Sequence, residues 1–209
     1  MKRMISTLVV ITLVLLLSQP TWAAGNDSTQ KERLKKAREA NKETEIRSTV
    51  TVDVGKLDIS GIRLGMTPDE VRAAIEKAYP NSKIDIRETS ARHRSYTGKT
   101  LDCTSEGIRI KVSFALEPYG KGVFWVKFHS DLPDVEVSFF RDKLVSKYGK
   151  PNLLNERGIG MIAVWGDAKS KALEATVSPQ VLILELTDQG PAKAYADKES
   201  ATAKEKIKF

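Results

Sequence analysis

A marked helix start at residues 66–71, MTPDEV, constrains the fold of this chain more than any other stretch. Thr67 can cap the first turn with its hydroxyl, and Pro68 stands at the first helical position, where an N–H would have no helical partner. Glu70, three residues after Thr67, completes a capping box. Apolar residues then recur at helical spacing until Pro80 ends the run. The pattern predicts an amphipathic helix of about three turns.

A second helix is predicted within residues 134–148, before a stop formed by Gly149 and Pro151. An offset of 69 residues superimposes the two helix sequences. It places Val71, Arg72, Ile75 and Tyr79 on Phe140, Arg141, Leu144 and Tyr148. The agreement indicates an internal repeat.

Three strand-like segments follow each helix, and the last two after the first helix alternate apolar and polar residues. They cover residues 84–86, 108–114 and 123–128 after the first helix, and 161–165, 173–177 and 181–186 after the second. The order helix and three strands therefore occurs twice. We predict an α+β fold of two α-β-β-β units in tandem, with the helices packed on an antiparallel sheet.

The first 24 residues have the layout of a secretory signal peptide. Lys2 and Arg3 precede an apolar core at residues 8–17, and small residues follow at 23–24. The apolar run is shorter than the roughly 20 residues of a membrane-spanning helix. We expect cleavage and export of the mature protein.

Composition divides the remainder into three parts. Residues 25–48 are rich in Lys, Arg and Glu and are interpreted as a charged, partly helical arm. Residues 49–188 are predicted to form the tandem-repeat domain, with units at about 58–130 and 131–188. Residues 189–209 are interpreted as a flexible charged tail.

The net charge of +7 falls to about +5 once Lys2 and Arg3 are removed with the signal. This mild excess favours weak attraction to an anionic membrane surface and lacks the dense basic stripe of a nucleic-acid-binding protein. An acidic partner would also suit this charge, and no nucleic acid is expected.

Residues that commonly perform chemistry are sparse. Cys103 is the only cysteine, so it cannot form a disulfide within the chain, and we interpret it as a small buried residue. His93 and His129 have no metal-ligand spacing, and the GxSxG motif is absent. Asp131 and Asp134, near His129, fit helix capping and a turn. No catalytic, metal-binding or cofactor-binding residue is predicted, and no cofactor is expected.

The candidate partner-binding residues lie in the long polar connection at residues 87–100. They are Arg92, His93, Arg94, Tyr96 and Lys99. Arginine and tyrosine on a loop suit a protein interface or an anionic ligand, and a solvated hairpin loop is the alternative. Trp125 and Trp165 lie in apolar strands and are predicted to belong to the core.

The string GIRLGMTPDEV at residues 61–71 resembles the repeat of the SmpA/OmlA and beta-lactamase-inhibitor-like superfamily of small exported bacterial proteins. The similar residues are Gly65, Met66, Thr67, Glu70 and Val71 in the first unit, and Tyr148, Gly149, Pro151, Trp165 and Gly166 in the second. Two departures stand out. The chain lacks the lipidated cysteine of the outer-membrane assembly lipoproteins, and its single cysteine cannot reproduce the disulfides typical of the inhibitor branch.

The resemblance implies a soluble, non-catalytic binding module of the bacterial envelope. It favours the periplasm, with secretion to the medium as the alternative. The predicted partner is a protein of the cell envelope, and a ligand is the other kind of molecule that such a module could bind. A more specific alternative is an inhibitor of an envelope enzyme or a foreign enzyme. A third possibility is an enzyme of unrecognised type that acts on an anionic envelope substrate.

Overall fold

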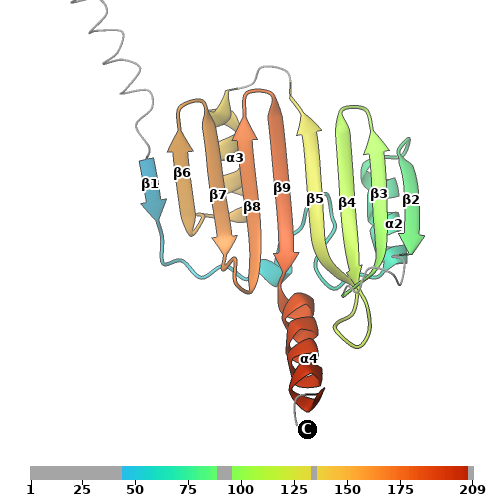
Figure 1. Cartoon of the computed structure of the whole chain (residues 1–209). Helices are drawn as coiled ribbons and strands as arrows, with labels where there is room; N and C mark the ends of the chain where they lie inside the picture. Colours follow the sequence, from blue (N-terminus) through green and yellow to red (C-terminus); the bar gives the residue numbers. More distant parts are fainter. Residues whose placement is uncertain (1–43, 89–95, 133–135, 207–209) are drawn as a thin grey trace, which may run out of the picture. The chain divides into compact units, whose positions relative to one another are not determined.

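Nine strands form one open antiparallel sheet in the computed structural model, which describes residues 44–88, 96–132 and 136–206 (Figure 1). The order across the sheet is β1-β6-β7-β8-β9-β5-β4-β3-β2. The strands are β1 (Thr44–Arg47), β2 (Lys83–Glu88), β3 (Thr97–Ser105), β4 (Ile108–Ala115), β5 (Val123–Asp131), β6 (Leu153–Arg157), β7 (Gly160–Gly166), β8 (Lys171–Ser178) and β9 (Val181–Asp188). The helices are η1 (Val54–Lys56, 3-10), α2 (Pro68–Ala78), α3 (Val137–Tyr148) and α4 (Gly190–Lys206). The predicted α+β class is confirmed.

The start of α2 has the predicted capping box. The Thr67 hydroxyl accepts a hydrogen bond from the Glu70 N–H at 3.4 Å, and a Glu70 carboxylate oxygen accepts one from the Thr67 N–H at 2.7 Å. Bonding to the Thr67 backbone, and then to its side chain, lowers the pKa of Glu70. The helix buries Val71 and Ile75 completely. The cap therefore positions these two side chains against the core.

Helix α3 begins differently, because Glu136 at its N-cap makes no side-chain capping bond. Asp131 is the last residue of β5 and does not cap the helix, so that interpretation was wrong. Asp134 lies outside the described residues. The helix ends at Gly149, whose φ of 79° suits glycine.

Both α2 and α3 lie on the same face of the sheet, behind it in Figure 1. Their buried residues join one core cluster with the strands. Because Val112, Val126 and Leu186 point into this core, their strand neighbours point to the other side. We call that other side the open face. It carries Lys111, Ser113, Trp125, Lys127, Glu185 and Thr187.

Four strands, and not the predicted three, follow each of the two helices. The missed strands are β3 and β6, and both are rich in polar residues. Strands β5 and β9, the last strand after each helix, pair with each other and make the sheet continuous. The central pairing therefore lies between residues about 55 positions apart in the chain, such as Phe128 and Leu184.

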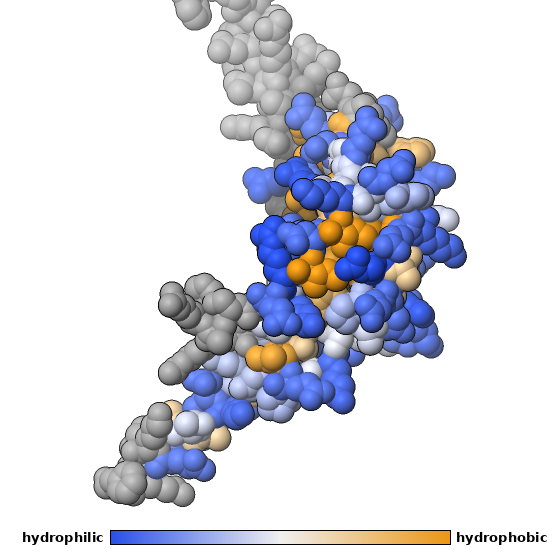
Figure 2. Space-filling view, turned by 90° about the vertical axis from the view of Figure 1, so that its right-hand side faces the viewer, coloured by the Kyte–Doolittle hydropathy of each residue, from blue (hydrophilic) through white to orange (hydrophobic). Residues whose placement is uncertain are grey.

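The two edges of the sheet are β1 and β2. Strand β1 pairs with β6, so the last residues of the predicted arm belong to the sheet. Figure 2 faces the β2 edge and shows a hydrophobic area framed by hydrophilic residues. Ile84 and Ile86 of β2 pack against the core there and are only partly buried. The core thus reaches the protein surface at this edge.

Residues 190–206, within the predicted tail, form helix α4, which the sequence analysis did not anticipate. Whether this segment is flexible stays a prediction. No helix among the described residues is both long enough and apolar enough to cross a bilayer.

Two tyrosines anchor the segment that precedes α2. The Tyr148 hydroxyl donates a hydrogen bond to the Asp58 carbonyl at 2.8 Å, and the Tyr79 hydroxyl lies 2.8 Å from the Ser60 hydroxyl. Between these contacts, Ile59 and Ile62 form a bridge and are fully buried. The ends of the two helices therefore hold one short segment in place.

Candidate binding site on the open face

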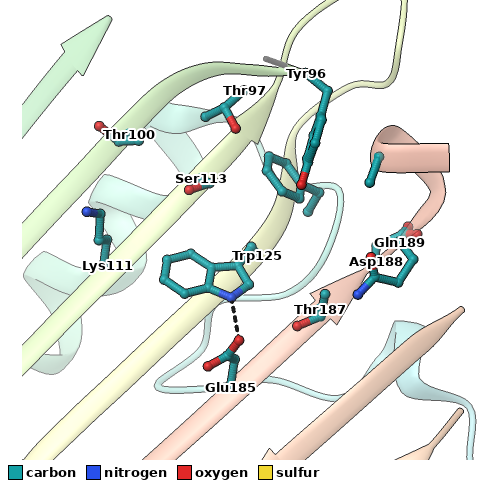
Figure 3. A pocket seen from close by; sticks show the side chains of 12 residues that line it. Tyr96, Thr97, Thr100, Lys111, Ser113, Trp125, Glu185, Thr187, Asp188 and Gln189 are labelled. Carbon is teal, nitrogen blue, oxygen red and sulfur yellow. Dashed lines mark hydrogen bonds between the residues drawn. The ribbon is translucent and has the colours of Figure 1, made fainter. Parts of the chain in front are cut away.

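A pocket of about 530 Å³ lies on the open face, over strands β3, β4, β5 and β9 and beside the first turn of α4 (Figure 3). We call it the Trp125 pocket. Its lining residues are Tyr96, Thr97, Thr100, Lys111, Ser113, Phe124, Trp125, Glu185, Thr187, Asp188, Gln189 and Ala192. Aromatic rings, hydroxyls and charges converge on one volume, which is typical of small-ligand sites.

Trp125 lies at the centre of the pocket, and its orientation is held by Glu185 (Figure 3). The indole Nε1–H donates a hydrogen bond to Glu185 Oε1 at 2.8 Å, and Lys127 Nζ lies 3.6 Å from Glu185 Oε2. The prediction that Trp125 belongs to the core was wrong, because its neighbour Val126 takes the core side of β5. The prediction for Trp165 is confirmed, since that side chain is fully buried.

Four further aromatic residues form one side of the pocket and its surroundings. The Tyr96 and Phe124 rings meet edge to face, with centroids 5.2 Å apart. Tyr195 of α4 packs against Tyr96 at 6.1 Å and against Tyr119 at 5.1 Å. These contacts dock α4 beside the pocket, where its Ala192 completes the lining.

The hydroxyl of Ser113 is the most unusual polar group of the pocket. Ser113 is the one polar residue of the described chain classed as buried, with 8% of its surface exposed. Among the described residues, no hydrogen-bond partner is found for its hydroxyl. Its oxygen is open to the pocket, because the only fully buried side-chain oxygen without a partner among the described residues is that of Ser82. A ligand or water in the pocket can therefore bond to the Ser113 hydroxyl.

The charges of the pocket are unequally paired. Glu185 is near Lys127, and Asp188 lies 3.2 Å from Lys171 Nζ and accepts a bond from the Gly190 N–H at 2.8 Å. Lys111 forms no ion pair with any described residue, although Asp102 is its register partner on β3. The unpaired charge in the pocket is therefore positive.

The predicted partner-binding residues are only partly within the described chain. Arg92, His93 and Arg94 lie outside it. Tyr96 lines the pocket, whereas Lys99 belongs to β3 and pairs with Glu88 at 3.4 Å. The predicted connection at residues 87–100 is shorter than expected, since its two ends belong to β2 and β3.

His129 belongs to a separate cluster on the open face. Arg109 Nη2 lies 3.1 Å from His129 Nδ1 and 3.6 Å from Asp131, whose Oδ1 is 3.7 Å from His129 Nδ1. Within the part of the chain that is described, no group of three or more His, Cys, Asp or Glu side chains could hold a metal ion. Cys103 is buried, as predicted.

The sequence reasoning missed Lys111 and Ser113 of β4 and Glu185 of β9. Alternation in VFWVKF carried a usable signal, because Val126 and Phe128 together define the core side and leave Trp125 and Lys127 on the other. No local pattern brings Glu185 to Trp125.

Comparison of the chain with protein-family models, curated proteins and solved structures found no match. The resemblance to the SmpA/OmlA and beta-lactamase-inhibitor-like superfamily stays a prediction.

Proposed function

We propose that this protein is an exported, non-catalytic interaction module of the bacterial envelope that binds a protein partner through the open face. The observation that carries the proposal is the Trp125 pocket, which adds an ordered aromatic residue to a sheet face that α2 and α3 leave uncovered. Tryptophan and tyrosine in preformed pockets are frequent anchors of protein interfaces. The pocket therefore supplies a centre for such an interface.

The predicted basic loop extends this surface in our proposal. Tyr96, one of the predicted partner-binding residues of this loop, lines the pocket, whereas Arg92 and Arg94 lie outside the described residues. Arginine side chains around an aromatic anchor favour a partner with acidic residues.

We further propose that the fold arose from two tandem units, each a helix followed by four strands. The outward order is the same on both sides of the central pair, β5-β4-β3-β2 and β9-β8-β7-β6. Tyr79 and Tyr148, which the 69-residue offset superimposes, both contact residues 58–60 through their hydroxyls. Matching order and matching contacts support duplication.

The location in the periplasm is part of the proposal: the signal-like residues 1–24 support export, and the resemblance to the SmpA/OmlA and beta-lactamase-inhibitor-like superfamily favours the periplasm over the medium. It places the partner among the proteins of the envelope, where weak attraction to anionic surfaces adds to the interaction.

A crosslinking pull-down from the periplasmic fraction tests the interaction, using protein that begins at Gly25. Trp125→Ala should abolish capture of a specific partner, because it removes the aromatic anchor. The matched control is Phe139→Ala, which truncates a half-exposed aromatic side chain on α3 (51% exposed). A second variant, with Arg92, Arg94 and Tyr96 changed to alanine, tests the loop. Capture that survives Trp125→Ala and is lost with Phe139→Ala would contradict the proposal.

A further inference from the structure

We infer that the Trp125 pocket is a binding site for a sugar ring that carries a carboxylate group, as in a uronic acid. This inference does not depend on the proposed protein partner. It assigns a small ligand to the pocket itself, from the ring, the hydroxyls and the charge that line it.

The first part of the argument is the stacking surface. Sugar rings have an apolar face of C–H groups, which packs on aromatic rings. The Trp125 indole is held by its hydrogen bond to Glu185, and Tyr96 and Phe124 stand beside it as an edge-to-face pair (Figure 3). Because the ring is already fixed, binding loses little side-chain entropy. The pocket thus offers a preformed stacking surface, Trp125, with the Tyr96 and Phe124 rings at its side, for a flat and partly apolar ligand.

The second part is the row of hydroxyls. Thr100 of β3, Ser113 of β4 and Thr187 of β9 all line the pocket, with β5 and its Trp125 between Ser113 and Thr187. Ser113 has 8% of its surface exposed, and no hydrogen-bond partner is found for its hydroxyl among the described residues. The only fully buried side-chain oxygen without a partner in this part of the chain is that of Ser82, so the Ser113 oxygen is open to the pocket that it lines. A sugar hydroxyl can both donate to and accept from such a group. A ligand rich in hydroxyls can therefore bond to a hydroxyl that faces the pocket and has no partner among the described residues.

The third part is the sign of the charge. An aromatic pocket with carboxylates could instead receive a cation. Here, however, Glu185 lies near Lys127 and Asp188 near Lys171, whereas Lys111 has no partner among the described ion pairs. The free charge favours an anionic group on the ligand, and a carboxylate accepts a charge-assisted hydrogen bond from lysine.

The size of the pocket agrees with this ligand. Its volume of about 530 Å³ lies within the range of roughly 300–1,000 Å³ that is usual for small-molecule sites. Lys111 and Asp188 lie on different sides of Trp125, so a carboxylate directed toward Lys111 points away from the Asp188 carboxylate (Figure 3). The ligand would then place its carboxylate at the β4 side.

Intrinsic fluorescence tests the inference directly. In protein that begins at Gly25, the only tryptophans are Trp125 and Trp165, and Trp165 is fully buried. A ligand that stacks in the pocket should change the Trp125 signal. We expect methyl glucuronide to give a saturable change, methyl glucoside to bind about tenfold more weakly, and acetate to give no change in the same concentration range.

Three variants assign the contacts. Lys111→Met should weaken glucuronide binding about tenfold and leave glucoside binding unchanged, because only the charge is lost. Ser113→Ala should weaken the binding of both sugars. The control is Lys83→Met on β2, an exposed lysine away from the pocket, which should change neither. Thermal melting confirms that each variant is folded.

The inference is overturned if neither sugar gives a saturable change, or if acetate binds as tightly as the glucuronide. It is also overturned if N-acetylglutamate binds more tightly than the glucuronide, which would assign the pocket to an acidic side chain of a protein. None of these results affects the pull-down with Trp125→Ala, so failure here and failure of the proposed protein interaction remain distinguishable.

Discussion

The indole N–H of Trp125 donates a hydrogen bond to Oε1 of Glu185, 2.8 Å away, across the pairing of β5 with β9. The bond is diagonal, because the register partner of Trp125 is Thr187 and that of Glu185 is Lys127. It links a strand that follows α2 to a strand that follows α3. The candidate site is therefore assembled from both halves of the sheet.

Glu185→Ala should release the Trp125 ring. We expect a loss of about 1 kcal/mol in the free energy of unfolding and greater quenching of Trp125 by acrylamide. Glu174→Ala is the matched control, because Glu174 faces Glu185 on β8 and is exposed. Equal quenching in both variants would show that the hydrogen bond does not order the ring.

Thr67→Ala should destabilise the protein by about 1 kcal/mol, because the first turn of α2 loses its side-chain cap. Glu136→Ala provides the comparison, since the N-cap of α3 makes no side-chain capping bond. That change should stay within about 0.5 kcal/mol. Urea denaturation of both variants measures the difference, and equal losses would contradict the role of the capping box.

Tyr148→Phe should cost about 1 kcal/mol of stability at neutral pH, because the Asp58 carbonyl loses a buried donor. Tyr79→Phe should cost less, since Tyr79 is only partly buried and its partner, the Ser60 hydroxyl, is a side chain that can turn to water. Thermal melting distinguishes the two. A larger effect from Tyr79→Phe would reverse our assignment of the main anchor.

The stability of the wild-type protein should fall at alkaline pH partly because of Tyr148. Burial is the largest influence on this phenol and raises its pKa above the usual value. The folded state then binds more protons than the unfolded state above about pH 10, so the stability falls as the pH rises through the folded pKa. In urea titrations at increasing pH, the decline should be shallower for Tyr148→Phe. Parallel declines would remove Tyr148 as a cause.

Tyr195→Ala should loosen α4, because this ring makes the aromatic contacts with Tyr96 and Tyr119. We expect faster amide hydrogen exchange within residues 190–206, with exchange in β5 and β9 unchanged. Lys204→Ala, an exposed position on the same helix, serves as the control. Unchanged exchange in the Tyr195 variant would mean that α4 is held by other contacts.

The sequence predicted those helices and strands that residues close together in the chain specify. The α2 start follows from Thr67 and Glu70, three residues apart, and both helices were found. Strand β3 was missed because most of its residues are polar and only Leu101 and Cys103 are buried. Its extended conformation depends on backbone pairing with β2 and β4, which its own sequence does not reveal. Propensity is a weak guide for such strands.

The candidate site was beyond prediction for a different reason. Ser113 and Glu185 reach the same pocket only through the register of β4 with β5 and of β5 with β9. The second of these pairings joins residues about 55 positions apart, and nothing in either segment specifies the partner. Tyr96 was identified from its residue type and lines the pocket, although its place there could not be derived.

The pairing of β5 with β9 also limits how this chain can be divided. Seven residue pairs, from Trp125 with Thr187 to Asp131 with Val181, lie in that ladder. A fragment that ended after either half would expose a long inner strand with unpaired backbone groups, a template for aggregation. Truncated forms should therefore aggregate and be insoluble. If the two halves are produced as separate chains, they should be soluble only when they are expressed together.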